Sequence, residues 1–229
     1  MAYFTLCGAG DALSWIDSME SIYASASRDY DSISLMNAAR SIDKRPLMDR
    51  QSPRALLIRG LIYWRMELIA YCSNEKVRLL RYGSIALSTL NEAEKAGVDP
   101  YLTSSHRAFA CQLIAGLGIS KGAIYGPRSA AETKKARLVN PQGYFTLLAT
   151  AVNASQAPSF AGGNPKKAVV LLEKMEQEFP DSIDVKIHLA RAYRRSQRLT
   201  DARAVIQPII QSHPKNLLAR MIWAETMAQ

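Results

Sequence analysis

Basic side chains gathered near the C-terminus are the residues of this sequence best suited to recognition chemistry. They lie on two consecutive helical stretches. Guanidinium groups form paired hydrogen bonds with carboxylates, so such a cluster suits a peptide C-terminus or acidic side chains. The alternative is a solvated face, because runs of charge on helices commonly face only water. The predicted binding set consists of Ile187, Arg191, Arg194, Arg195, Lys215, Asn216 and Arg220.

Residues arranged for catalysis are not apparent. The histidines lie far apart, without an HExxH motif or an acidic partner at ligand spacing, and no GxSxG motif occurs. The cysteines, Cys7, Cys72 and Cys111, are odd in number, widely separated and in no CxxC arrangement. We therefore expect no enzymatic activity, no cofactor and no metal site.

The composition is that of a folded protein with a basic surface. The chain has 229 residues, of which 48% are hydrophobic and 21% charged, and its net charge is +9. No apolar run reaches the roughly 18 residues that a membrane-spanning helix needs. The charge favours acidic partners. Nucleic acid ranks below protein, because the aromatics nearest a basic run, Tyr144 and Phe145, stand at a helix start where core residues are needed.

The first ten residues, MAYFTLCGAG, do not resemble a secretory signal. They carry no basic region and their apolar part is too short. The sequence therefore predicts a cytoplasmic protein. The alternative is a periplasmic or envelope-anchored protein, in which Cys7 is the lipidated N-terminus and the true start lies upstream; Leu6 is too large for a good lipidation motif.

A repeat in the C-terminal third determines the predicted architecture. The segments NPKKAVVLLEKMEQEFPDSI and RLTDARAVIQPIIQSHPKNL align with a constant offset of 34 residues. Each carries apolar residues at i, i+4 and i+7, the spacing of one helical face, and each closes at a proline, which cannot extend a helix. The aligned pairs are Ala168 with Ala202, Leu172 with Ile206, Met175 with Ile209, and Pro180 with Pro214.

This segment resembles a tetratricopeptide repeat, a helix–turn–helix unit of 34 residues. The resemblance covers roughly residues 165–228, with Lys186 where the family commonly has Trp. It implies that the first helix of each pair lines a concave groove, and that Lys, Arg and Asn side chains there hold a partner's carboxylates. The matching positions are Leu189, Ala190, Tyr193, Ala202 and Pro214.

Upstream the repeat is looser but persists. Ala86, Leu90 and Ala93 repeat the i, i+4, i+7 spacing, and the preceding helical stretch places Gly60 and Tyr63 in the G-x2-Y arrangement. We expect an all-α, tetratricopeptide-like α-solenoid of about five helix pairs with a C-terminal capping helix. It forms a single domain over residues 1–229, with degenerate pairs in 1–103 and recognisable repeats and the cap in 104–229.

Two glycine-containing stretches are predicted to connect the two helices of a pair. APSFAGGNPKKAV contains Phe160, Gly162 and Gly163 and lacks the GxxxxGK[ST] pattern of a phosphate-binding loop. ISKGAIYGPRSAAE contains Tyr125. Equivalent loops lie along one edge of a repeat stack. Tyr125 and Phe160 are therefore expected either to cover an apolar pocket or to plug the ends of their own repeats.

Two functions follow from these observations. The first is a non-enzymatic scaffold that binds an acidic protein or peptide in its concave groove. The second rests on the lengthened loops, which resemble those of bacterial envelope repeat proteins, including the T component of TRAP-type solute transporters. That resemblance implies a ligand-binding or assembly component with an apolar pocket. The sequence leaves open the partner's identity and whether copies of the chain self-associate.

Overall fold

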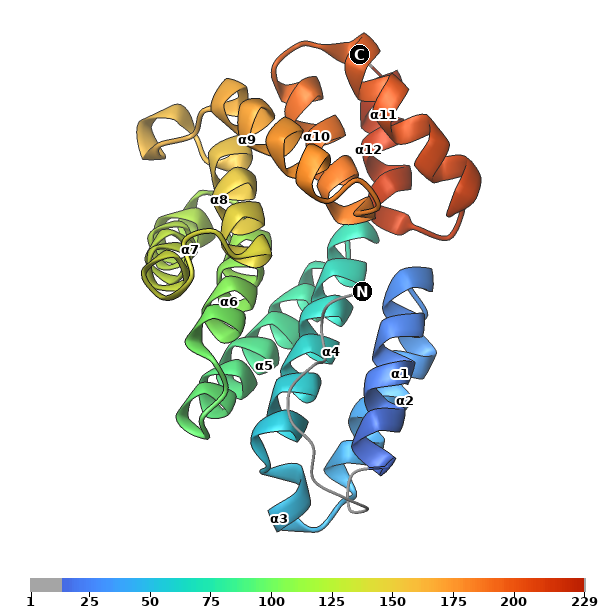
Figure 1. The fold of residues 1–229 in the computed structure, drawn as a ribbon, viewed down its shortest axis with the longest axis vertical. Helices are drawn as coiled ribbons and strands as arrows, with labels where there is room; N and C mark the ends of the chain where they lie inside the picture. The colour runs from blue at the N-terminus through green and yellow to red at the C-terminus, as the bar shows by residue number, and fades with distance from the viewer. Residues whose placement is uncertain (1–13, 229) are drawn as a thin grey trace.

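The computed structural model describes residues 14–228, and within this range the chain is helical with no strand (Figure 1). One 3-10 turn, η1 (Ser159–Ala161), interrupts the series between α8 and α9. The α-helices are α1 (Ser14–Asp29), α2 (Ser32–Asp43), α3 (Leu47–Arg50), α4 (Pro53–Cys72), α5 (Lys76–Lys95), α6 (Pro100–Ala115), α7 (Ile119–Val139), α8 (Tyr144–Gln156), α9 (Pro165–Glu178), α10 (Ile183–Arg195), α11 (Leu199–Ser212) and α12 (Leu217–Met227).

The helices form the predicted α-solenoid. The pairs α1–α2, α4–α5, α6–α7, α8–α9 and α10–α11 each pack together, and α12 follows as the last helix. The first helices of consecutive pairs also contact one another, α4 with α6, α6 with α8 and α8 with α10. Figure 1 shows the resulting curved stack, in which α12 returns toward α4. The expectation of about five pairs and a final helix is confirmed.

Small residues allow the paired helices to cross closely. Ala190 of α10 and Ala202 of α11 are both fully buried, as the repeat alignment predicted. At the α4–α5 crossing, a Cβ placed on Gly60 would lie 2.7 Å from Leu90 Cδ2, so only glycine fits without a shift of that leucine. The G-x2-Y position predicted at Gly60 therefore marks a real helix contact.

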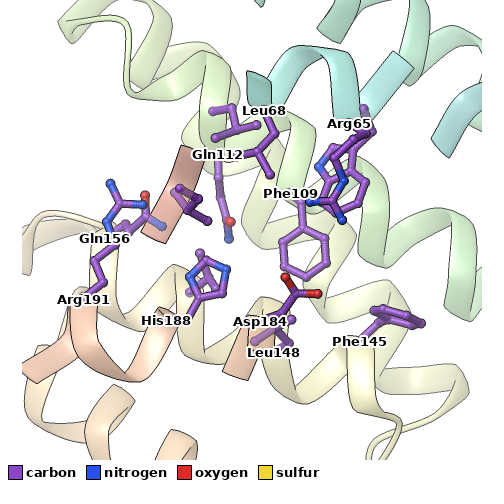
Figure 2. Close-up of a pocket in the computed structure, with 14 residues that line it drawn as sticks. Arg65, Leu68, Phe109, Gln112, Phe145, Leu148, Gln156, Asp184, His188 and Arg191 are labelled. Atoms are coloured by element: carbon purple, nitrogen blue, oxygen red, sulfur yellow. The ribbon is translucent and has the colours of Figure 1, made fainter. Parts of the chain in front are cut away.

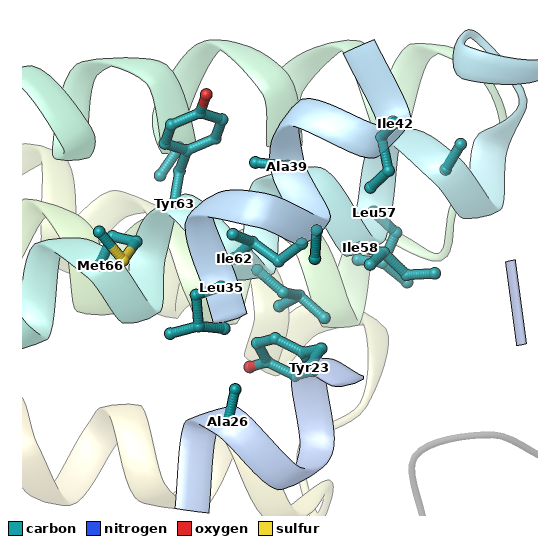
Figure 3. Close-up of a cluster of buried hydrophobic side chains, with 14 of the residues drawn as sticks. Tyr23, Ala26, Leu35, Ala39, Ile42, Leu57, Ile58, Ile62, Tyr63 and Met66 are labelled. Atoms are coloured by element: carbon teal, nitrogen blue, oxygen red, sulfur yellow. The ribbon is translucent and has the colours of Figure 1, made fainter. Parts of the chain in front are cut away.

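The N-terminal pairs have a substantial core although their repeat pattern is weak. Figure 3 shows Tyr23 of α1 and Leu35 and Ile42 of α2 packed around Ile58 and Ile62 of α4. All five side chains are buried. The apolar positions are thus kept even where the spacing of the family is lost, because burial depends on a helical apolar face and not on specific residues.

The glycine stretch before α9 is a connector, as predicted. Asn164 caps α9, with its side chain accepting a hydrogen bond from the Lys167 amide at 3.0 Å. Gly162 adopts a left-handed φ of 87° that favours glycine. A Cβ on Gly163 would lie 1.8 Å from the Ala157 carbonyl oxygen. Both glycines are therefore explained by the backbone path.

The prediction that the stretch ISKGAIYGPRSAAE connects two helices is wrong. Residues 119–139 form one continuous helix, α7, with Pro127 inside it, so Tyr125 lies on a helix and not in a loop. Proline removes one backbone hydrogen bond, here to the Ala123 carbonyl. Both Ala123 and Pro127 are exposed, so water can satisfy that carbonyl. Tyr125 instead packs half-buried against the cluster that contains Leu79 and Cys111.

A carboxylic acid is buried between α4, α5 and α6. Glu67 is 0% exposed, and no described group forms a hydrogen bond with either of its carboxyl oxygens. A Cβ on Gly83 of α5 would lie 2.5 Å from Glu67 Oε1, so the glycine makes the space for this side chain. Burial raises the pKa of Glu67 well above its ordinary value, which favours the neutral acid.

We predict that Glu67 makes stability depend on pH. Because its pKa is raised in the folded state, the folded protein binds more protons than the unfolded one above about pH 4.5, and stability falls as pH rises toward the folded pKa. Wild type and Glu67→Gln should be unfolded with urea between pH 4 and 9. As pH rises, the free energy of unfolding of the variant should increase relative to that of wild type, by up to about 1.4 kcal/mol per pH unit. A difference that is constant with pH would contradict a neutral buried acid.

We also predict that Ala202→Leu is destabilising. The added atoms must enter the fully buried α10–α11 crossing, which should cost about 1–3 kcal/mol in the free energy of unfolding. Ala204→Leu is the matched control, because Ala204 lies on the same helix and is exposed. Thermal melts in which the two variants behave alike would contradict the assigned repeat packing.

Candidate functional site in the concave face

A pocket lies on the concave side of the solenoid, where α4, α6, α8, α10 and α12 converge. These are the first helices of their pairs together with the final helix, the set that the repeat resemblance places around the groove. Each helix contributes side chains spaced three or four residues apart, such as Phe109 and Gln112 on α6 or Asp184 and His188 on α10. A helix presents residues of that spacing on one face, so the site is built by neighbouring helical faces.

The floor of the pocket is aromatic and aliphatic. Trp64 of α4 and Phe109 of α6 lie with ring centroids 5.7 Å apart, and Phe145 and Leu148 of α8 extend the surface. Behind them the ring of His106 lies 5.0 Å from Trp64 and 4.9 Å from Phe145, centroid to centroid. This cluster joins three consecutive first helices, so the floor also holds the repeats together.

Charged side chains surround this floor. In Figure 2, Asp184 and His188 extend from α10 toward Phe109 and Gln112 of α6, and Arg191 is drawn next to Gln156 of α8. Arg65 of α4 lies over the rings of Trp64, at 4.9 Å, and Tyr30, at 5.6 Å, from guanidinium carbon to ring centroid. Such stacking holds a guanidinium in one orientation.

Arg191 is a buried cation of the pocket, as Arg65 is. It is 8% exposed, and its Nη2 donates a hydrogen bond of 2.7 Å to the Tyr71 hydroxyl of α4. No described carboxylate forms an ion pair with it, and its Nε has no hydrogen-bond partner among residues 14–228. Its positive charge is therefore satisfied only by neutral groups and the Tyr71 ring, 5.8 Å away.

His188 is a neutral imidazole in this setting. Burial, followed by the charges of Arg191 and Arg65, lowers the pKa of His188 to about 3. A third positive charge beside the guanidinium groups of Arg191 and Arg65 is unfavourable, so His188 becomes protonated only at strongly acidic pH. The pocket thus presents two permanent cations, Arg65 and Arg191, against one carboxylate, Asp184. This excess of positive charge in the pocket lining favours the binding of an anionic group.

The structure separates the predicted binding residues into four kinds: pocket-lining, ion-paired, buried, and exposed outside the pocket. Arg191 lines the pocket, whereas Arg194 is bound to Glu225 of α12 at 2.7 Å. Ile187 is fully buried and cannot line an open groove, because its position on α10 faces the α11–α12 core. Asn216 is also buried, and its side chain caps α12 by accepting from the Ala219 amide at 2.9 Å. The expectation of a groove role for these two residues is wrong.

The remaining members of the predicted set are exposed and lie outside the pocket lining. They are Arg195, Lys215 and Arg220.

The predicted pocket loops do not line this pocket either. Phe160 is 92% exposed in η1, and Tyr125 belongs to α7. Neither aromatic covers the concave site, and Gly162 and Gly163 shape only their own connector. Phe160 is no plug of its repeat, because a side chain so exposed has few packing partners.

The residues that sequence reasoning missed are Trp64, Arg65, Phe109, Phe145, Asp184 and His188. A usable signal existed on α10, where Asp184, His188 and Arg191 repeat at i, i+4 and i+7 within a helix expected to line the groove. On α4 the signal was hidden, because nearly every side of that helix is apolar.

Several general properties of the described residues bear on function. Within residues 14–228 no three His, Cys, Asp or Glu side chains gather where they could hold a metal ion. None of the described helices combines the length and apolarity needed to cross a membrane.

Comparison with known proteins agrees with this architecture. The family model described as tetratricopeptide repeat matches residues 159–222. A crystal structure of a thermophilic TPR protein from Thermus thermophilus is similar over 94% of this chain and 98% of that one, with a TM-score of 0.61 and 16% sequence identity. The comparison with curated proteins found no match. The chain is thus an all-α solenoid whose residues 159–222 match the tetratricopeptide-repeat model.

Proposed function

We propose that this protein is a non-enzymatic scaffold that binds an acidic protein or peptide in its concave pocket. The observation that carries the proposal is Arg191, a buried guanidinium that no described carboxylate neutralises. A buried charge without a partner is unfavourable, so an incoming carboxylate would satisfy a group that the fold leaves uncompensated. The paired donors of a guanidinium match the two oxygens of a carboxylate.

Another buried arginine in this structure, Arg107, is neutralised by carboxylates of its neighbouring helices. Arg107 of α6 has a side chain that is 3% exposed, and it is held by Glu94 at 2.7 Å and by Glu132 at 2.8 Å. Both carboxylates come from the helices that pack against α6, α5 and α7. Arg191 has comparable burial but lines a pocket and faces tyrosine. This contrast supports a role in binding for Arg191.

The size and lining of the pocket indicate what part of a partner it accepts. Its cavity volume is about 40 Å³, whereas sites that enclose drug-sized ligands have roughly 300–1,000 Å³. The floor of Trp64, Phe109 and Phe145 suits one apolar side chain beside the carboxylate. We therefore infer that a short acidic segment, with a neighbouring apolar residue, occupies the site.

The aromatic floor also favours a second candidate, an apolar small ligand of the kind expected for an envelope assembly component. The two candidates differ in their need for charge. An apolar ligand would bind to the floor alone, and its binding would not weaken with salt. Binding of a carboxylate held by Arg191 would weaken as the salt concentration rises.

Selection from a displayed library of random peptides tests the proposal. Peptides captured by wild type should be enriched in Asp and Glu, and Arg191→Gln should weaken their binding about 10–100-fold, the range for a hydrogen-bonded charge in a desolvated site. Arg128→Gln is the control, because it removes the same charge from an exposed position on α7. Binding should also weaken with salt.

Captured peptides that bind wild type and Arg191→Gln equally would sink the carboxylate proposal. Salt-independent capture of apolar sequences would instead favour the second candidate.

A further inference from the structure

The two ends of the solenoid meet, and the line where they meet forms one wall of the pocket. In an open repeat stack each unit contacts only its neighbours. Here α12 packs against α4, although nearly the whole length of the repeats separates them in sequence. One buried cluster contains Tyr30, from the turn between α1 and α2, and Leu68 of α4 together with Ile187, Leu218 and Ile222 from α10 and α12. We call this contact the seam.

A polar contact also spans the seam. The hydrogen bond from Arg191 to the Tyr71 hydroxyl joins α10 to the C-terminal end of α4. Arg191 and Leu218 line the pocket on one side of the seam, and Leu68 lines it on the other. Separating the two sides would therefore enlarge the pocket and release Arg191 from tyrosine.

The C-terminal side of the seam is held together by contacts of its own. Arg194 of α10 forms an ion pair with Glu225 of α12 at 2.7 Å, and Arg203 of α11 donates a hydrogen bond of 3.4 Å to the Thr226 carbonyl. Helices α10, α11 and α12 also pack on one another. They would consequently move as one body, with the seam as the place where motion occurs.

We propose that the solenoid is a clasped ring, whose seam opens to admit a partner while Arg191 exchanges the Tyr71 hydroxyl for the partner's carboxylate. The admission of a partner rests on the proposed function; the opening of the seam does not. Exchange of this kind couples binding to opening, because the ligand favours the state in which Arg191 is free. It also explains how a site with so small a closed volume accepts a peptide segment.

Native cysteines on α4 and α6 provide the measurement. Cys72 lies next to Tyr71 and packs half-buried against the seam cluster, whereas Cys111 is fully buried in the cluster between α4, α5 and α6. Opening of the seam exposes Cys72 and leaves Cys111 covered; global unfolding exposes both. Rates of N-ethylmaleimide labelling at each cysteine, read by mass spectrometry of the full chain, separate these events.

Two variants, which we call the clasp variants, remove the hydrogen bond between Arg191 and Tyr71, one from each side of the seam. Tyr71→Phe and Arg191→Gln each remove the hydrogen bond, so each should raise the labelling rate of Cys72 about tenfold relative to Cys111. The double variant should label no faster than the faster single variant, because both remove one shared interaction. Arg191→Gln excludes an effect limited to the residue beside Cys72.

Tyr144→Phe is the matched control. It removes a tyrosine hydrogen bond of the same 2.7 Å length, to Ser182, and neither of these residues belongs to the seam cluster. It should leave the labelling of Cys72 unchanged. Labelling of Cys72 that is unaffected by both clasp variants, or that rises only in step with Cys111, would overturn the clasped ring.

The outcomes separate this inference from the proposed function. If Cys72 is labelled faster in Tyr71→Phe and Arg191→Gln but no acidic peptide is captured, the clasped ring is supported and the proposed binding function is contradicted. If captured peptides depend on Arg191 but the labelling of Cys72 does not change, the proposed function is supported and the clasped ring is contradicted. A captured peptide should itself raise the labelling of Cys72 in wild type, and failure to do so would overturn the exchange at Arg191.

Discussion

Close crossing of paired helices at small residues is the constraint on which the rest of this structure depends. A Cβ on Gly60 would lie 2.7 Å from Leu90 Cδ2, and Ala190 and Ala202 are both fully buried in the α10–α11 pair. At these positions the helix axes can approach closely because the side chains are small or absent. Tight pairs then stack with a small rotation at each step, and the first helices collect on the inner side of the curve. The pocket on α4, α6, α8 and α10 follows from that curvature.

The fold was largely predictable from the sequence, because its signals are local and repeated. The offset of 34 residues, the i, i+4, i+7 spacing and the closing prolines each specify a helix or its end. Pro127 misled because proline breaks a helix through a lost hydrogen bond, and an exposed helix face lets water replace it. Whether a proline ends a helix therefore depends on solvent exposure, which the sequence does not show directly.

The site was less predictable, because it is made by residues from five helices that only the curvature brings together. Arg191 was predicted from a run of arginines that is visible in one segment, but its neighbours Arg194 and Arg195 have different surroundings. On a helix, residues three positions apart can face a pocket and a neighbouring helix respectively. Asn216 shows a further ambiguity, because a side chain suited to holding a carboxylate is equally suited to capping a helix.

The position of Arg191 shows how recognition and closure can share one side chain. A guanidinium buried in a protein needs a partner in every state that is populated. Arg107 has permanent carboxylates and is fixed, whereas Arg191 has a neutral hydroxyl that binds it more weakly than a carboxylate would. A weak partner is what an exchangeable contact requires, since a strong one would hold the ring closed against any ligand. The lack of an ion pair between Arg191 and any described carboxylate is thus consistent with closure of the solenoid through a contact that a ligand can replace.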